Sequence, residues 1–123
     1  MEDKKSISES FLKMTISGNI ENAFNLFIHE EFFHHNPYFH GDRESLKLGM
    51  IDNHFKNPNK VIDIFQIIEE NEKVVVHSKL TLPQNKMEMN VIHIFRFKEN
   101  KIIELWDIGV PIPSEIHNKN GIF

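Results

Sequence analysis

The stretch Ile102-Ile103-Glu104-Leu105-Trp106-Asp107-Ile108-Gly109 predicts a central strand, and the rest of the fold can be placed relative to it. Side chains alternate along a strand, so one face carries Ile103, Leu105, Asp107 and Gly109. The other face carries Ile102, Glu104, Trp106 and Ile108. Both faces are largely apolar, which predicts that the strand is covered on both sides, with Trp106 packed against a helix. A carboxylate on a covered face costs free energy unless it is paired, hydrogen-bonded or protonated, so Asp107 either stabilises the fold or does chemistry.

The length and composition are those of one globular domain. The chain has 123 residues, 40% of them hydrophobic, with eleven phenylalanines and one tyrosine. A chain of this length buries roughly two-thirds of its unfolded surface, which is enough for one core. A core so rich in phenylalanine can line an apolar pocket. Residues 1–123 are therefore expected to form a single domain.

Charge, cysteine content and hydropathy exclude several classes of function. The formal charge of −4 leaves no basic stripe for phosphates, so no nucleic acid partner is expected. The absence of cysteine excludes disulfides, thiolate metal sites and cysteine nucleophiles. No apolar run approaches the roughly 20 residues of a membrane span, and the N-terminus has no apolar signal core. These features predict a cytoplasmic protein without a membrane partner.

Apolar spacing predicts three helices before any long strand. The first runs from roughly Ser6 to Ser17, the second follows Asn19 and includes Ile28 on its apolar face, and the third is capped by Asp42. Between the second and third helices, residues 31–41 predict a short strand followed by a loop. The inner side of the third helix is expected to carry Leu46, Met50 and either His54 or Phe55.

Four runs of period two follow the helices, over about 61–69, 73–82, 87–98 and 101–110. The connections between them are short, which predicts an antiparallel meander. Helices first and a sheet afterwards define an α+β fold. The tail from Pro111 onward is expected to be irregular.

Two polar residues fall on the predicted inner face of the last two strands. His93 interrupts an otherwise apolar row, and Asp107 lies on the neighbouring strand, so the two can point into the same space with His77 close behind. A carboxylate and two imidazoles in an apolar cavity can do acid–base chemistry. Burial raises the pKa of such an acid and a protonated histidine lowers it, so its working value stays open. Asp107 paired with His93 to order the core, and His77 as a structural histidine, are the alternatives.

A metal site is the other hypothesis for the histidines, based on the cluster His29, His34, His35 and His40. Adjacent residues of a strand point to opposite faces, so His34 and His35 cannot easily hold one ion. No H-E-x-x-H or two-histidine, one-carboxylate spacing is present. We therefore expect no metal site. A phosphate-binding glycine loop and a G-x-S-x-G motif are also missing, which argues against nucleotide binding and serine hydrolysis.

Several short motifs, in this order and spacing, resemble the SnoaL-like branch of the NTF2-like superfamily. They are His35-Asn36-Pro37, Gly41-Asp42-Arg43-Glu44, Val75-Val76-His77-Ser78, Ile94-Phe95-Arg96-Phe97, residues 101–107 and residues 118–123. The resemblance covers nearly the whole chain. It implies a cone-shaped α+β barrel, in which three N-terminal helices pack on a curved, mainly antiparallel sheet around an apolar pocket. It also implies a homodimer formed through the outer face of the sheet.

The resemblance further implies an activity. In polyketide cyclases of this branch, an acid in the final strand is the general acid/base of an intramolecular aldol condensation, helped by a histidine and needing no cofactor. Asp107 would take that role, with His93 and His77 as helpers and a hydrophobic small molecule as substrate. Removing a proton next to a carbonyl needs such a base and a donor for the enolate oxygen. The implied substrate-binding residues are His35, Asn36, Tyr38, Phe95 and Phe97.

The sequence departs from this branch at two positions. His93 stands where relatives often carry an acid, and Leu105 stands where they often carry a histidine. The alternative function is therefore a non-catalytic protein of the same fold, either a binder of a hydrophobic small molecule or a dimeric scaffold.

Overall fold

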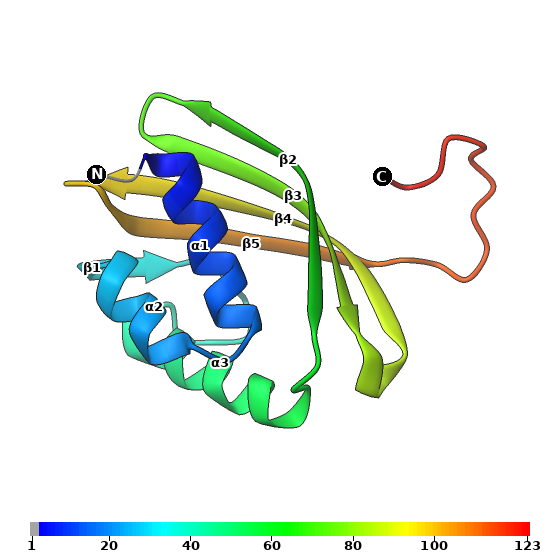
Figure 1. Cartoon of the computed structure of the whole chain (residues 1–123), viewed down its shortest axis with the longest axis horizontal. Coiled ribbons are helices and arrows are strands. Elements are labelled where there is room, and N and C mark those ends of the chain that lie inside the picture. The colour runs from blue at the N-terminus through cyan, green and yellow to red at the C-terminus, as the bar shows by residue number, and fades with distance from the viewer. Residues whose placement is uncertain (1–2) are drawn as a thin grey trace.

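A computed structural model describes residues 3–123, in which three helices pack on one face of a five-stranded sheet (Figure 1). The helices are α1 (Lys4–Ile16), α2 (Ile20–Phe27) and α3 (Arg43–Lys56). The strands are β1 (Ile28–His34), β2 (Val61–Glu70), β3 (Lys73–Leu82), β4 (Met87–Lys98) and β5 (Lys101–Pro111), with a short 3-10 helix, η1 (Pro83–Asn85), before β4. The predicted α+β fold is confirmed. None of the described helices is long and apolar enough to cross a membrane.

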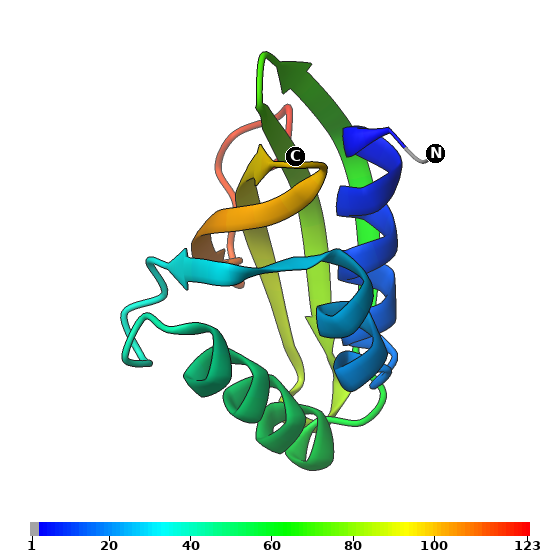
Figure 2. The same ribbon diagram turned by 90° about the vertical axis from the view of Figure 1, so that its left-hand side faces the viewer.

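The order of strands in the sheet is β1-β5-β4-β3-β2. Strands β2 to β5 form the predicted antiparallel meander, whereas β1 pairs with β5 in parallel. Strand β5 therefore has a neighbour on each edge. We call the side of the sheet that faces the helices the inner face and the opposite side the outer face (Figures 1 and 2). The segment after β5 is irregular, as predicted, and its last residue, Phe123, contacts the outer face through Phe65 and His77.

The helix ends follow local capping chemistry. Helix α1 begins after Asp3, whose carboxylate accepts a hydrogen bond from the backbone N of Ser6 at 2.8 Å. Helix α3 begins after Asp42, as predicted, and Asp42 accepts from the backbone N of Ser45 at 3.1 Å. The assignment of Ile28 to a helix is wrong. Ile28 is the first residue of β1, where it pairs with β5 and starts a strand that runs without a loop from α2.

The core consists mainly of aromatic rings between the helices and the inner face. Phe11 of α1 packs on Phe24 of α2 with ring centroids 5.6 Å apart, and on Phe95 of β4 at 6.0 Å. Helix α3 contributes Leu46, which is fully buried. Of the two alternatives for the end of this helix, His54 turns inward against Gly18, while Phe55 is exposed.

A β-bulge in β5 changes the predicted facing at the start of that strand. Arg96 pairs with Glu104 but Phe97 pairs with Ile102, so Ile103 is an extra residue. Ile102 therefore joins the core in place of Ile103. Beyond the bulge the alternation is as predicted, which places Asp107 on the inner face. Coverage of both faces is only partly correct, because Ile108 on the outer face is half exposed.

Candidate functional site

Asp107 and His93 meet on the inner face, as predicted. They are directly opposite each other on β5 and β4, and Nε2 of His93 lies 3.3 Å from Oδ1 of Asp107. The side chain of His93 is 14% exposed and that of Asp107 is 26% exposed. The pair is therefore largely desolvated, yet the carboxylate can still be reached from outside.

Asn36, in the loop after β1, holds the other oxygen of the same carboxylate. Its side-chain Nδ2 donates to Oδ2 of Asp107 at 3.0 Å. Its Oδ1 accepts from the backbone N of Tyr38 at 3.0 Å, which fixes the amide so that the nitrogen faces the acid. Asp107 is thus oriented from two sides, by an imidazole on β4 and by an amide after β1.

The charge state of Asp107, left open by the sequence, follows from these contacts. Burial by itself would raise the pKa of Asp107. The neighbouring His93 and the hydrogen bond from Asn36 outweigh burial, and the pKa lies below its ordinary value. Asp107 is therefore an ionised carboxylate at neutral pH, which is the form that can accept a proton.

His34 is a member of this site that sequence reasoning considered only as a metal ligand. It lies on β1 opposite Leu105 and is 5% exposed. Its Nδ1 accepts a hydrogen bond from the backbone N of Asn36 at 3.1 Å, and its Nε2 is buried without a partner in residues 3–123. Burial lowers its pKa more than the carboxylates of Asp42 and Asp107 raise it. Alternation in the run from Phe32 to His35 was the signal that could have placed it on the same face as the apolar Phe32.

The predicted placement of His77 near Asp107 is wrong. In the register of β3 and β4, His77 pairs with Ile92, and Val76 pairs with His93, so His77 lies on the outer face. There Nδ1 lies 3.1 Å from Nε2 of Gln66, and Nε2 lies 2.7 Å from Oδ1 of Asn90. These contacts make His77 part of a polar cluster on the far side of the sheet from Asp107.

His35 also lies on the outer face. Its Nε2 is 2.7 Å from Oε2 of Glu104, and Arg96 donates through Nε to Oε1 of the same carboxylate at 2.7 Å. Burial alone would raise the pKa of Glu104, but His35 and Arg96 outweigh it and lower the pKa. The His35 ring stacks on Trp106 with centroids 5.0 Å apart. Trp106 therefore packs on a histidine, and the prediction that it packs on a helix is wrong.

The remaining predicted binding residues do not surround Asp107. Tyr38 is 85% exposed. Phe95 and Phe97 are buried in the core, and the ring of His93 stacks on Phe95 with centroids 6.0 Å apart. Phe95 therefore packs against His93 from the side of the core. The aromatic ring at the edge of the site is Phe39, which lies 6.5 Å from the His34 ring and so close to α3 that a Cβ on Gly49 would overlap it.

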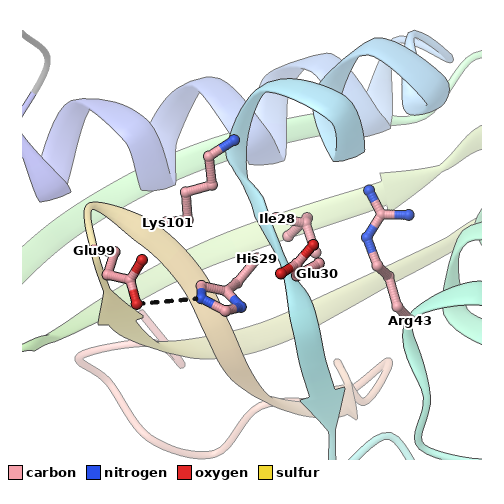
Figure 3. A pocket seen from close by; sticks show the side chains of 6 residues that line it. All are labelled: Ile28, His29, Glu30, Arg43, Glu99 and Lys101. Atoms are coloured by element: carbon pink, nitrogen blue, oxygen red, sulfur yellow. Dashed lines mark ion pairs between the residues drawn. The ribbon is translucent and has the colours of Figure 1, made fainter.

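Two of the hollows in the part of the chain that the structure describes lie away from Asp107. The larger, about 420 Å³, lies where β1, the β4–β5 turn and α3 meet (Figure 3). The two cationic side chains that line it already bind carbonyl oxygens of α2. Arg43 donates to the carbonyl oxygen of Phe24 at 3.2 Å, and Lys101 donates to that of Leu26 at 3.4 Å. The smaller, about 210 Å³, lies at the β2–β3 turn. Asp107 lines neither of these two hollows.

No group of three or more histidine or acidic side chains within residues 3–123 is arranged to hold a metal ion. The four histidines of the sequence cluster are separated by the fold. His34 points to the inner face and His35 to the outer face, as alternation requires. His29 lies 3.9 Å from Glu99 at the rim of the larger hollow, and His40 is exposed.

Comparisons with known proteins support the fold. No family model and no curated protein matches the chain. A solved SnoaL-like polyketide cyclase from Agrobacterium tumefaciens shares 9% identity, covers 89% of this chain and 93% of its own, and has a TM-score of 0.73. An NTF2-like protein of unknown function from Cytophaga hutchinsonii shares 13% identity with the chain. The match covers 89% of this chain and 92% of that protein, with a TM-score of 0.69.

A cystatin-fold protein from Novosphingobium aromaticivorans shares 10% identity with the chain, covers 88% of it and 99% of its own length, and has a TM-score of 0.76. At these identities the comparison defines the fold. The chain has the α+β architecture of NTF2-like proteins, and its solved structural neighbours include a SnoaL-like polyketide cyclase. The resemblance noted in the sequence motifs is thereby confirmed at the level of the fold.

Proposed function

We propose that this chain is a cofactor-independent small-molecule enzyme in which Asp107 removes a proton from a carbon next to a carbonyl group. Aldol-type cyclases, lyases and isomerases share this step. The observation that carries the proposal is an ionised, partly exposed carboxylate on the inner face, held by His93 on one oxygen and by Asn36 on the other. The fold shared with a SnoaL-like polyketide cyclase supports the same class of reaction.

The contacts of Asp107 restrict the substrate. A carboxylate with a lowered pKa is a weak base, and proton transfer is efficient only when the donor and acceptor pKa values are not far apart. The substrate is therefore a hydrophobic small molecule whose C–H bond is activated twice, by a carbonyl group and by an aromatic ring or a second carbonyl. His93 is placed to exchange a proton with Asp107 once the acid is protonated.

A ketone of this kind tests the proposal directly. 2-Tetralone has a C–H group between a carbonyl and an aromatic ring, and its exchange for deuterium in D₂O can be followed by proton NMR. The wild-type chain should accelerate the exchange, and Asp107→Asn should reduce the acceleration roughly 100-fold or more. Asp63→Asn, which changes an exposed acid on β2, is the matched control and should leave the rate unchanged. Equal rates for wild type and Asp107→Asn would rule out Asp107 as the base.

A non-catalytic binder of hydrophobic molecules is the second candidate. The observation that favours it is Phe39, an exposed aromatic ring at the edge of the site that a hydrophobic molecule can contact. The two candidates differ in one measurement. A binder takes up 2-tetralone or its aromatic analogue 2-naphthol, with a fluorescence change, but does not speed deuterium exchange.

We also propose that the chain forms a homodimer through the outer face. Phe65, Ile108 and Val110 are each about half exposed on or beside that face, which gives a partner an apolar surface. Sedimentation velocity tests this. Ile108→Lys should shift a dimer toward the monomer, whereas Leu26→Lys, at an equally exposed position on α2, should not. A wild-type chain that sediments as a monomer at all concentrations would disprove the dimer.

A further inference from the structure

We propose that His34 is a further catalytic residue of this site, whose uncharged Nε2–H group binds the carbonyl oxygen of the substrate as that oxygen becomes an enolate. The inference rests on the proposed role of Asp107 as the base. It assigns different tasks to the two inner-face histidines, because His93 contacts the carboxylate whereas Nε2 of His34 is uncommitted.

The position of the hydrogen on His34 follows from its hydrogen bond. The backbone N–H of Asn36 donates to Nδ1 at 3.1 Å, and a ring nitrogen that accepts a hydrogen bond carries no hydrogen itself. In the neutral ring the hydrogen is then on Nε2. This N–H is buried and has no acceptor in the part of the chain that the structure describes. A buried donor without an acceptor is costly to the fold, and a substrate oxygen is an acceptor that would satisfy it.

The fold brings this donor beside the base. Strands β1 and β5 are parallel, and His34 lies opposite Leu105, two residues before Asp107 on the same face. Pairing continues past the end of β1, because the backbone N of His35 donates to the carbonyl oxygen of Leu105 at 2.9 Å. Asn36 then reaches Asp107 itself. The imidazole and the carboxylate are thus neighbours on one face, close enough for the charge of Asp107 to act on His34.

The surroundings of His34 fix its ring and keep it uncharged. Phe32 stacks on one side with centroids 6.1 Å apart, and Phe39 lies edge-on at 6.5 Å. Burial among these rings lowers the pKa of His34. A neutral, fixed donor in a desolvated setting stabilises a developing negative charge strongly, because little reorganisation is needed when the charge forms.

The proposed step conserves atoms and charge. The C–H bond of the substrate breaks, its proton passes to a carboxylate oxygen of Asp107, and the electron pair moves through the carbon–carbon bond onto the carbonyl oxygen. The enolate oxygen accepts the hydrogen bond from Nε2 of His34. Return of the proton to a different carbon completes an isomerisation. In an aldol closure the enolate carbon attacks a second carbonyl group, and the alkoxide that forms takes the proton back from Asp107. Neither route needs an oxidant or reductant.

The rate of deuterium exchange of 2-tetralone distinguishes the role of His34 as a hydrogen-bond donor from its role as a packed aromatic ring. His34→Phe keeps an aromatic ring but removes the donor, and His34→Gln keeps an N–H group at a similar reach. We expect His34→Phe to slow exchange roughly 100- to 1,000-fold, the usual effect of losing one oxyanion donor, and His34→Gln to stay within about tenfold of wild type. His40→Phe, which changes an exposed histidine of the following loop, is the control and should be neutral.

The outcomes for the two proposals differ. If Asp107→Asn is inactive and His34→Phe is as fast as wild type, the role of His34 is overturned while that of Asp107 stands. If wild type itself does not exchange 2-tetralone, the proposed function fails for this class of ketone. The role of His34 as a donor is then tested by the binding of 2-naphthol.

The binding measurement uses 2-naphthol, whose anion has the shape and charge of the 2-tetralone enolate. In Asp107→Asn, the neutral amide imitates the protonated acid that exists after proton transfer. Absorbance titration should show that Asp107→Asn binds the naphtholate form about 10- to 100-fold more tightly than the double variant Asp107→Asn/His34→Phe, the range expected for one hydrogen bond to an anion. Equal affinities, or nitrogen NMR shifts that place the hydrogen of His34 on Nδ1, would overturn the proposal.

Discussion

The imidazole of His93 and the carboxylate of Asp107 lie opposite each other across β4 and β5, with Nε2 and Oδ1 3.3 Å apart. Both residues come from paired strands of one hairpin, so their separation is set by backbone pairing and not by a loop. A site built in this way is rigid, and its contribution to stability can be measured together with its contribution to activity.

The first prediction concerns acid stability. The pKa of Asp107 in the folded chain lies below its ordinary value of 3.8, so its ionised form stabilises the fold at pH values above 3.8. That contribution is lost as pH falls below 3.8 through the folded pKa. The free energy of urea unfolding of wild type should therefore fall toward that of Asp107→Asn between pH 5 and pH 3, a range that brackets 3.8. For Asp63→Asn the difference from wild type should stay constant, and a constant difference for Asp107→Asn would contradict the prediction.

The second prediction concerns the ionic cluster on the outer face. Glu104 is buried and is bound by both His35 and Arg96, so Glu104→Gln leaves a partly buried guanidinium without its counter-charge. We expect a loss of about 2 kcal/mol in the free energy of unfolding. The matched variant is Glu88→Gln, which breaks the more exposed pair with Lys79 and should cost less than about 1 kcal/mol. Similar losses in urea titrations of the two variants would show that the Glu104 cluster is no stronger than a surface pair.

The third prediction concerns the turn between α1 and α2. Gly18 has a φ of +93°, and a Cβ there would overlap the ring of His54. Gly18→Ala should therefore combine a backbone cost of about 1 kcal/mol with a steric cost against the ring. Gly121 also has a positive φ, but a Cβ there meets nothing within 4 Å, so Gly121→Ala isolates the backbone cost.

A double-variant cycle tests the steric part of the Gly18 prediction. In the presence of His54→Ala, Gly18→Ala should lose less stability than it does alone, because the clashing ring is gone. Thermal unfolding of the four chains gives the coupling. Additive effects would mean that His54 moves aside without cost.

The fourth prediction distinguishes core packing from pocket lining at Phe95. This residue is fully buried against Phe11 and beneath His93. Phe95→Ala should lower the free energy of unfolding by about 3–5 kcal/mol through the cavity it leaves. Phe55→Ala, at an exposed position of α3, should change it by no more than about 0.5 kcal/mol. A loss below about 1 kcal/mol at Phe95 would mean that its ring lines an opening that solvent can fill.

Part of the site was predictable because it depends on short-range connections. The β4–β5 turn is only Glu99-Asn100, both with positive φ, and so short a turn predicts that the two strands pair with each other. Alternation along the two strands placed His93 and Asp107 on the same face, whereas counting outward from the turn without the bulge at Ile103 would have placed His93 opposite Trp106. Alternation could not assign a face to His77, because β3 carries valines on both faces.

The rest of the site depends on pairing between distant segments. Asn36 and Asp107 are 71 residues apart, and they meet because β1 adds in parallel to the edge of the meander. Nothing in the spacing of residues 31–41 says which strand they pair with. The roles of His34 and Asn36 around the acid therefore needed the tertiary structure, as did the finding that Phe95 is packed and not open.

The bulge in β5 has a consequence for chain length. Ile103 is the residue without a cross-strand partner. Its removal would convert the hairpin to regular pairing and leave all the remaining side chains of β5 on their present faces. The hairpin can thus become one residue shorter without turning Asp107 away from His93. In an alignment with a protein of the same fold whose last hairpin has no bulge, a gap at Ile103 keeps the acid in register, whereas an ungapped alignment counted from the turn displaces it by one residue.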